Sequence, residues 1–184
     1  MPKLLHYHRF ENFLPEHLIT EIQQYCVDHE SEFTDSLVGN INNRQVDKKN
    51  RVSLVTKNLG DLHEKFKQAI TKILPEIYSK LEIKPFDIKK FEMEIAAHGD
   101  GAFFVRHIDT VTQLPEQDGA RTISAVYYFF TEPKAFKGGE LRIFPFELLE
   151  GNDTEVDLSP MHNSLVVFPS FVAHEVLPVS APNV

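Results

Sequence analysis

The stretch from Gly99 to Thr110 reads GDGAFFVRHIDT and decides how this chain is interpreted. His107 and Asp109 stand two residues apart near its end. In an extended chain, residues i and i+2 point to the same face, so an imidazole and a carboxylate would project side by side into one space. Both groups are common metal ligands, and the pair is therefore the first candidate for chemistry.

A third ligand would complete a recognised kind of metal site. Two histidines and one carboxylate on one face of a metal form the facial triad of non-haem Fe(II) oxygenases. His174 is the candidate, because it opens an apolar strand 65 residues after Asp109. Two other interpretations stay open on these residues alone: His107 and Asp109 could simply share a hydrogen bond at a sheet edge, or the set could hold zinc as a hydrolase or form a cupin-type site.

Composition excludes several other classes of protein. The chain has 184 residues, enough for one ordinary domain, and 42% of them are hydrophobic. Its single cysteine, Cys26, excludes an internal disulfide. A net charge of −8 argues against a nucleic-acid partner, and no apolar run approaches a membrane span. We expect a soluble, cytoplasmic protein with no membrane association; the oligomeric state stays open.

Hydrophobic periodicity divides the chain into two parts. Residues 13–82 are mostly helical in pattern, with one apolar stripe at a period of 3.6 over residues 61–81 that Pro75 should kink or divide. Residues 29–50 indicate a loop, and residues 51–56 a short strand. From about residue 87 the period changes to two. Strands are then expected at 91–97, 122–130, 141–144, 165–168 and 172–177.

The sequence around the candidate ligands resembles the prolyl 4-hydroxylase-type Fe(II)/2-oxoglutarate-dependent dioxygenases. Residues 99–110 resemble the segment that carries the first two ligands in that family. Further similar blocks follow in the family's order at residues 121–129, 138–143, 165–170 and 174–179. Together they span about half of the chain.

The resemblance implies an α+β fold, with a double-stranded β-helix, or jelly roll, and N-terminal helices packed outside it. We expect one domain over residues 1–184, with residues 1–86 as a helical N-terminal support and residues 87–184 as the β-helix core. It also implies that His107, Asp109 and His174 are the catalytic metal ligands and hold Fe(II).

The same resemblance implies an activity. The enzyme would use 2-oxoglutarate and O2, form succinate and CO2, and hydroxylate an amino-acid side chain in a peptide or a small molecule. Ascorbate is a further candidate cofactor. The substrate-facing loops would lie at residues 110–120 and 146–163, outside the similar blocks, so the sequence leaves the substrate open.

Co-substrate contacts follow from the same alignment of motifs. Tyr128 matches a tyrosine that bonds the distal carboxylate of 2-oxoglutarate in some members of the family. Leu141 and Val176 match apolar walls of the co-substrate pocket, as do Val126 and Met93. For all of these residues a place in an ordinary core is the alternative interpretation.

The sequence departs from the family after His174. The family has an arginine or lysine on the next strand, paired with the 5-carboxylate of 2-oxoglutarate, and no basic residue follows His174 here. We expect a truncated chain that lacks the last strand of the β-helix; the alternative is that another basic residue, such as Arg142, substitutes for the missing base. The rival hypothesis is a catalytically incompetent metal-binding β-helix that acts as a binding or sensing module.

Overall fold

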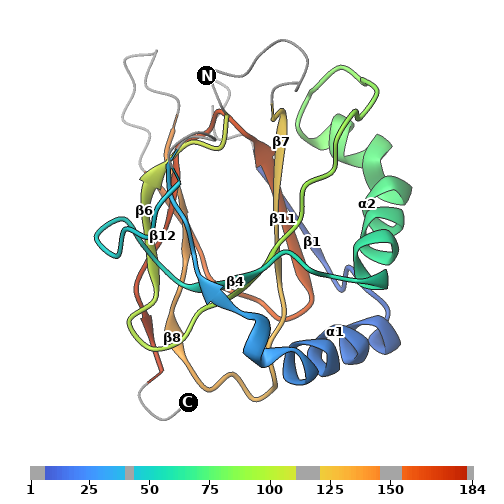
Figure 1. The fold of residues 1–184 in the computed structure, drawn as a ribbon. Helices are drawn as coiled ribbons and strands as arrows, with labels where there is room; N and C mark the ends of the chain where they lie inside the picture. The colour runs from blue at the N-terminus through green and yellow to red at the C-terminus, as the bar shows by residue number, and fades with distance from the viewer. Residues whose placement is uncertain (1–6, 40–43, 111–120, 146–154, 182–184) are drawn as a thin grey trace.

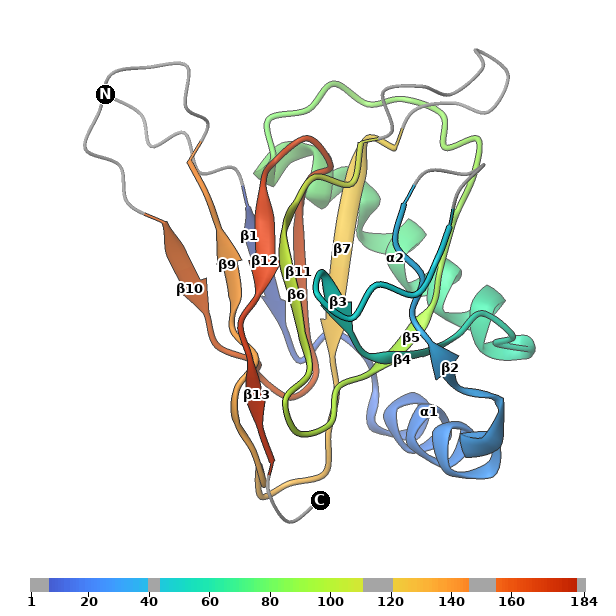
Figure 2. The same ribbon diagram turned by 60° about the vertical axis from the view of Figure 1, so that its left-hand side comes forward.

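Two facing β-sheets organise the computed structural model, which describes residues 7–39, 44–110, 121–145 and 155–181. The first is antiparallel and has the order β1 (His8–Glu11), β11 (Ser164–Pro169) and β7 (Ile123–Tyr128). The second has five strands, which Figure 2 shows side by side. Their order is β10 (Val156–Leu158), β9 (Leu141–Ile143), β12 (His174–Val176), β6 (Phe103–His107) and β3 (Arg51–Val52).

Strand β11 is buried on both faces and belongs to two cores. Val166 and Phe168 pack between the sheets with Leu141 and Ile143, which are fully buried. Leu165 and its neighbours on the opposite face pack against the helices. Because successive side chains of a strand point to opposite faces, an unbroken apolar run is what such a doubly covered strand requires.

The two α-helices of the described residues lie on the outer side of the three-stranded sheet (Figure 1). They are α1 (Glu16–Asp28) and α2 (Asp61–Lys80), and a short 3-10 turn, η1 (Glu30–Glu32), follows α1. The apolar stripe of α2 faces the sheet through Ile70 and Ile77. Pro75 does not divide the helix, contrary to one of the two expectations, because packing along this stripe stabilises both turns around it.

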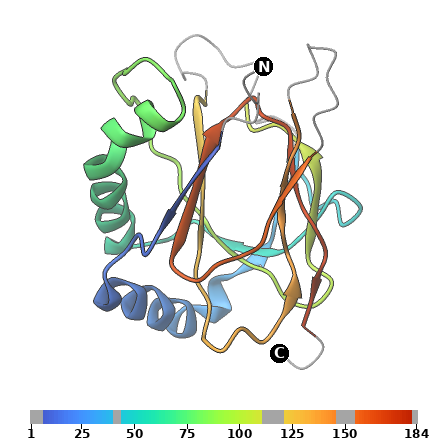
Figure 3. The ribbon, with the colours of Figure 1, turned by 180° about the vertical axis from the view of Figure 1, so that it is seen from behind.

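The N-terminal part contains more strand than its periodicity indicates. Strand β1 pairs with β11, and the view from behind shows the two side by side (Figure 3). A further sheet has the order β2 (Thr34–Asp35), β4 (Leu54–Thr56) and β5 (Ile95–Ala97). The description of residues 1–86 as a helical support is thus incomplete, because strands of two to four residues form by pairing with distant strands and leave little pattern of their own.

Two of the strands expected from the sequence have a different extent in the structure. The strand expected at residues 51–56 is two strands, of which β3 pairs with β6 and β4 pairs with β5. Buried Ser53 lies between them, where the chain passes from one sheet to the other. The strand expected at 91–97 is reduced to β5.

A close backbone approach fixes the segment that precedes β9. Strand β8 (Lys137–Gly138) pairs with β13 (Val179–Ser180). Gly138 has φ +72°, and a Cβ atom there would lie 2.1 Å from the carbonyl oxygen of Pro178. Only glycine fits this position, which explains why the similar block at residues 138–143 begins with a glycine.

The architecture confirms the expected fold class, a jelly roll with helices outside. In the parts of the chain that the structure describes, no helix has both the length and the apolar character needed to cross a membrane. The assignment of residues 1–184 to one domain stays a prediction.

Candidate metal centre

Three residues of metal-ligand type meet at one end of the five-stranded sheet. His107 is the last residue of β6, and His174 is the first residue of β12. They are direct cross-strand partners in the antiparallel pair, so their side chains share a face. Asp109 follows two residues after His107, and its backbone N–H donates to the carbonyl of Ser170 at 2.9 Å.

The ligand atoms of these three side chains converge. The Nε2 atom of His107 lies 3.6 Å from Oδ1 of Asp109, and the Nε2 atom of His174 lies 3.7 Å from Oδ2 of the same carboxylate. One ligand atom from each of the three residues lies within 4.8 Å of the other two. His107 and His174, which are 67 positions apart in sequence, are therefore brought together by the pairing of β6 with β12.

Backbone carbonyls fix the tautomer of both imidazoles. Nδ1 of His107 is 2.8 Å from the carbonyl oxygen of Val105, and Nδ1 of His174 is 2.9 Å from that of Val172. A carbonyl can only accept, so each Nδ1 donates and each neutral ring keeps its lone pair on Nε2. These lone pairs face Asp109, which is the orientation that a metal requires of its histidine ligands.

Burial surrounds both histidine rings and keeps His107 in the form that binds metal. His174 is only 4% exposed, and its ring contacts the ring of Phe168 edge-on, with 4.7 Å between the ring centroids. The ring of His107 stacks on the ring of Phe104, with 3.6 Å between the ring centroids. Burial, with a smaller contribution from neighbouring His174, lowers the pKa of His107 to about 4. His107 is therefore neutral at pH 7.

Two serines, which the sequence did not indicate, hold the carboxylate of Asp109. The hydroxyl of Ser124 on β7 donates to Oδ2 of Asp109 at 2.6 Å. The hydroxyl of Ser170 lies 2.9 Å from that of Ser124. Because the Ser124 hydroxyl already donates its only proton to Asp109, the Ser170 hydroxyl is the donor in this second hydrogen bond. Ser124 could have been found from the period-two pattern, which places it on the same face of β7 as Val126 and Tyr128; nothing in the sequence marks Ser170.

The predicted co-substrate residues lie in the core between the sheets. Tyr128, Leu141 and Val176 all belong to this core, together with Val126. The hydroxyl of Tyr128 is buried and has no hydrogen-bond partner among the described residues. Burial raises the pKa of this phenol, so it remains a neutral donor. A buried donor without an acceptor is what a binding site for a carboxylate would leave in the free protein.

Two further expectations are wrong. Met93 packs in the core beneath α1, on the other side of the three-stranded sheet, and does not line the core between the sheets. Arg142 alternates with inward-facing Leu141 and Ile143, so it points outward. There its guanidinium pairs with Asp157 through two hydrogen bonds of 2.7 and 2.8 Å.

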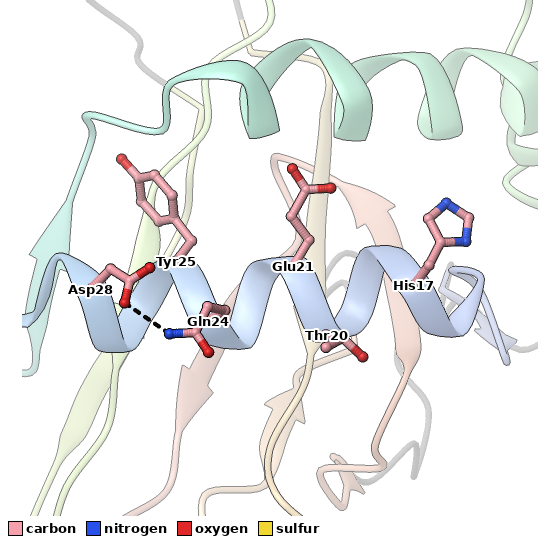
Figure 4. A pocket seen from close by; sticks show the side chains of 6 residues that line it. All are labelled: His17, Thr20, Glu21, Gln24, Tyr25 and Asp28. Atoms are coloured by element: carbon pink, nitrogen blue, oxygen red, sulfur yellow. Dashed lines mark hydrogen bonds between the residues drawn. The ribbon is translucent and has the colours of Figure 1, made fainter.

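A shallow depression on α1 is separate from this centre. Figure 4 shows its lining side chains along that helix, on the outside of the fold. The only hydrogen bond drawn among them joins Gln24 to Asp28 at 2.8 Å. The lining residues are His17, Thr20, Glu21, Gln24, Tyr25 and Asp28. Among the residues that the structure describes, the only cluster able to hold a metal is the one formed by His107, Asp109 and His174.

Comparison with known proteins agrees with this architecture. The family model described as "2OG-Fe(II) oxygenase superfamily" matches residues 93–183. An uncharacterized PKHD-type hydroxylase of Synechocystis sp. is 30% identical over 181 residues, which is 96% of this chain. This chain spans only 58% of the length of that relative.

Two solved structures have the same fold. A prolyl-4-hydroxylase of Pseudomonas putida is 26% identical with a TM-score of 0.70, over 94% of this chain and 86% of that one. A prolyl hydroxylase of Trichoplax adhaerens, in complex with a hypoxia inducible factor peptide fragment, is 22% identical with a TM-score of 0.67, over 96% of this chain and 79% of that one. In sequence and in fold, the chain therefore resembles the 2OG-Fe(II) oxygenase superfamily and, within it, the prolyl 4-hydroxylase type.

Proposed function

We propose that this chain is an Fe(II)- and 2-oxoglutarate-dependent dioxygenase in which His107, Asp109 and His174 bind the iron. The observation that carries the proposal is the convergence of two Nε2 lone pairs and one carboxylate at the end of the five-stranded sheet. Two imidazoles and a carboxylate on one face suit Fe(II) and leave its other coordination positions to ligands from outside the chain.

Each residue of the site then has a definite task. A ferrous ion held there supplies the oxidative chemistry, in which O2 and 2-oxoglutarate are converted to succinate and CO2 as the substrate is hydroxylated. Asp109 offsets part of the charge of the metal, and Ser124 holds that carboxylate in place. The hydroxyl of Tyr128 donates to the distal carboxylate of 2-oxoglutarate, while Leu141 and Val176 keep water from the co-substrate.

We propose an amino-acid side chain, in a peptide or a free amino acid, as the group that is hydroxylated. The Trichoplax adhaerens structure contains a peptide, and its fold is shared by this chain. Two large apolar side chains stand exposed beside the metal ligands: Ile108, between His107 and Asp109, is 48% exposed, and Phe171, next to Ser170, is 50% exposed. They offer a peptide an apolar contact at the edge of the site. Of the loops expected to face the substrate, residues 111–120 and 146–154 lie outside the described residues.

Succinate formation tests this proposal. Protein supplied with Fe(II), 2-oxoglutarate and O2 should form succinate, and a substrate peptide or amino acid should increase the rate. Asp109→Ala should abolish the reaction, and Asp28→Ala, which removes an exposed carboxylate from α1, should not. Ascorbate should be tested as an additive in the same assay.

The rival hypothesis of a non-catalytic module predicts a different result. A module would bind the metal through the same three residues but would form no succinate with any candidate substrate. Steady, iron-dependent succinate production would exclude the module. The cytoplasmic location and the oligomeric state stay expectations that this assay does not address.

A further inference from the structure

A shift of register in β6 brings Phe104 and His107 onto the same face of the sheet. Opposite them on β12 lie Val176 and His174, so three residue steps on β6 match two on β12. Residues three apart in a regular strand point to opposite faces, whereas an extra residue in one strand of a pair restores a common face. The rings of Phe104 and His107 accordingly stack, with 19° between their planes. The metal ligand therefore has an aromatic neighbour from its own strand.

Arg51 on β3, the edge strand of this sheet, lies over the same aromatic ring. It is directly opposite Phe104, so the two side chains share a face. The central carbon of the guanidinium is 4.9 Å from the centroid of the ring, which is within the range of a cation–π contact. The ring of Phe104 thus contacts the guanidinium of Arg51 as well as the imidazole of His107.

Polar partners hold the guanidinium of Arg51 in this place. Its Nη2 atom donates to Oε1 of Glu94 at 2.8 Å, and its Nε atom donates to the hydroxyl of Ser53 at 3.1 Å. Ser53 is buried, and the side chain of Arg51 is only 13% exposed. A hydrogen bond within an ion pair is stronger than a neutral one, and the planar fork of an arginine keeps its orientation when two of its nitrogens are bound. The guanidinium therefore has a fixed orientation beside the Phe104 ring.

We propose that Arg51 positions the metal ligand His107 through Phe104. Nδ1 of His107 donates to the carbonyl of Val105, which fixes one atom of the imidazole and leaves the plane of the ring to be set by other contacts. Stacking on Phe104 fixes this plane, and Arg51 keeps Phe104 in contact with His107. The inference rests on the proposed function, in which His107 binds the metal.

The charge of Arg51 distinguishes positioning from a purely electrostatic effect. A cation near a divalent metal ion repels it, so removal of the charge alone would strengthen metal binding. Loss of a positioning contact would weaken metal binding instead, because the Nε2 lone pair of His107 would no longer be held toward Asp109. The two effects have opposite signs, and a metal titration separates them.

Calorimetric titration with Mn(II) tests the inference without turnover. Arg51→Met retains the apolar stem but loses the cation, and its affinity for Mn(II) should fall about 10-fold. Arg51→Lys keeps the charge without the planar fork, so it should bind Mn(II) more weakly than the wild type and more tightly than Arg51→Met. The electron paramagnetic resonance spectrum of bound Mn(II), which reports the symmetry of its ligands, should change in both variants.

Two further variants show whether the effect passes through Phe104. Phe104→Leu should itself weaken Mn(II) binding, and adding Arg51→Met to it should cause no further loss, because the ring through which Arg51 acts is gone. Arg142→Met removes an arginine that is bound to a carboxylate on the outer face of the same sheet, and it should bind Mn(II) like the wild type.

The inference is overturned if folded Arg51→Met binds Mn(II) as tightly as the wild type or more tightly, or with an unchanged spectrum. It is also overturned if the losses in Arg51→Met and Phe104→Leu add in the double variant. If Arg51→Met does not fold, wild-type affinity in Arg51→Lys overturns it. A wild-type protein that binds no Mn(II) would overturn the proposed function itself, and the inference with it.

Discussion

Replacing Tyr128 by phenylalanine should stabilise the metal-free protein and weaken its binding of 2-oxoglutarate. The hydroxyl of Tyr128 is buried without a hydrogen-bond partner among the described residues. Burying such a group lowers the free energy of unfolding by about 1–3 kcal/mol, and this cost is absent in the phenylalanine variant. The ring stays the same, so packing against Val126 and Val176 in the core between the sheets is retained.

The change in melting temperature and the change in affinity for 2-oxoglutarate both have an expected magnitude. For a protein of this size, about 1 kcal/mol corresponds to a shift of roughly 2–4 °C in Tm. Tyr128→Phe in EDTA should therefore melt at least about 2 °C above the wild type. A lost hydrogen bond to a charged carboxylate is worth about 1.5–3 kcal/mol, so the affinity of the Mn(II)-loaded variant for 2-oxoglutarate should fall by about 10- to 100-fold.

The neighbouring tyrosine supplies the control. Tyr127 points to the opposite face of β7, where its hydroxyl donates to the side-chain oxygen of Asn163 at 3.1 Å. Tyr127→Phe should destabilise the protein by about 1 kcal/mol and leave the affinity for 2-oxoglutarate unchanged. The reasoning is refuted if Tyr128→Phe lowers Tm as Tyr127→Phe does, or if it binds 2-oxoglutarate like the wild type.

Three further predictions concern the metal centre and the segment before β9. Asp109→Ala should abolish Fe(II) binding while far-UV circular dichroism stays that of the wild type; full Fe(II) affinity in this variant would remove Asp109 from the site. Ser124→Ala, which deletes the 2.6 Å hydrogen bond to Asp109, should weaken metal affinity about 10- to 100-fold by calorimetry, and an unchanged affinity would contradict its positioning role. Gly138→Ala should destabilise the protein by about 2 kcal/mol or more in urea unfolding, because its Cβ would meet the carbonyl oxygen of Pro178; wild-type stability would show that this turn can relax.

The parts of the fold that local pattern encodes could be predicted from the sequence. The stripe of α2 follows from a period of 3.6, and the shared face of His107 and Asp109 follows from a period of two. The approach of His174 could be expected only from its strand context and the family resemblance. Its register opposite His107 is a property of the β6–β12 pair that no local pattern contains.

The parts of the fold and of the site that could not be predicted depend on contacts between distant segments. Strand β1 has four residues and no clear alternation, so only its pairing with β11, more than 150 residues away, makes it a strand. Ser170 is equally inconspicuous, because its contact with Ser124 arises from the fold alone.

The most direct test of the account is an anaerobic titration of the wild-type protein with Fe(II) and then 2-oxoglutarate, followed by visible absorption. The account predicts a metal-to-ligand charge-transfer band that saturates at one equivalent of iron and is absent in Asp109→Ala. Iron binding without any band would contradict a co-substrate pocket beside the metal. No iron binding at all would contradict the assignment of His107, Asp109 and His174 as its ligands.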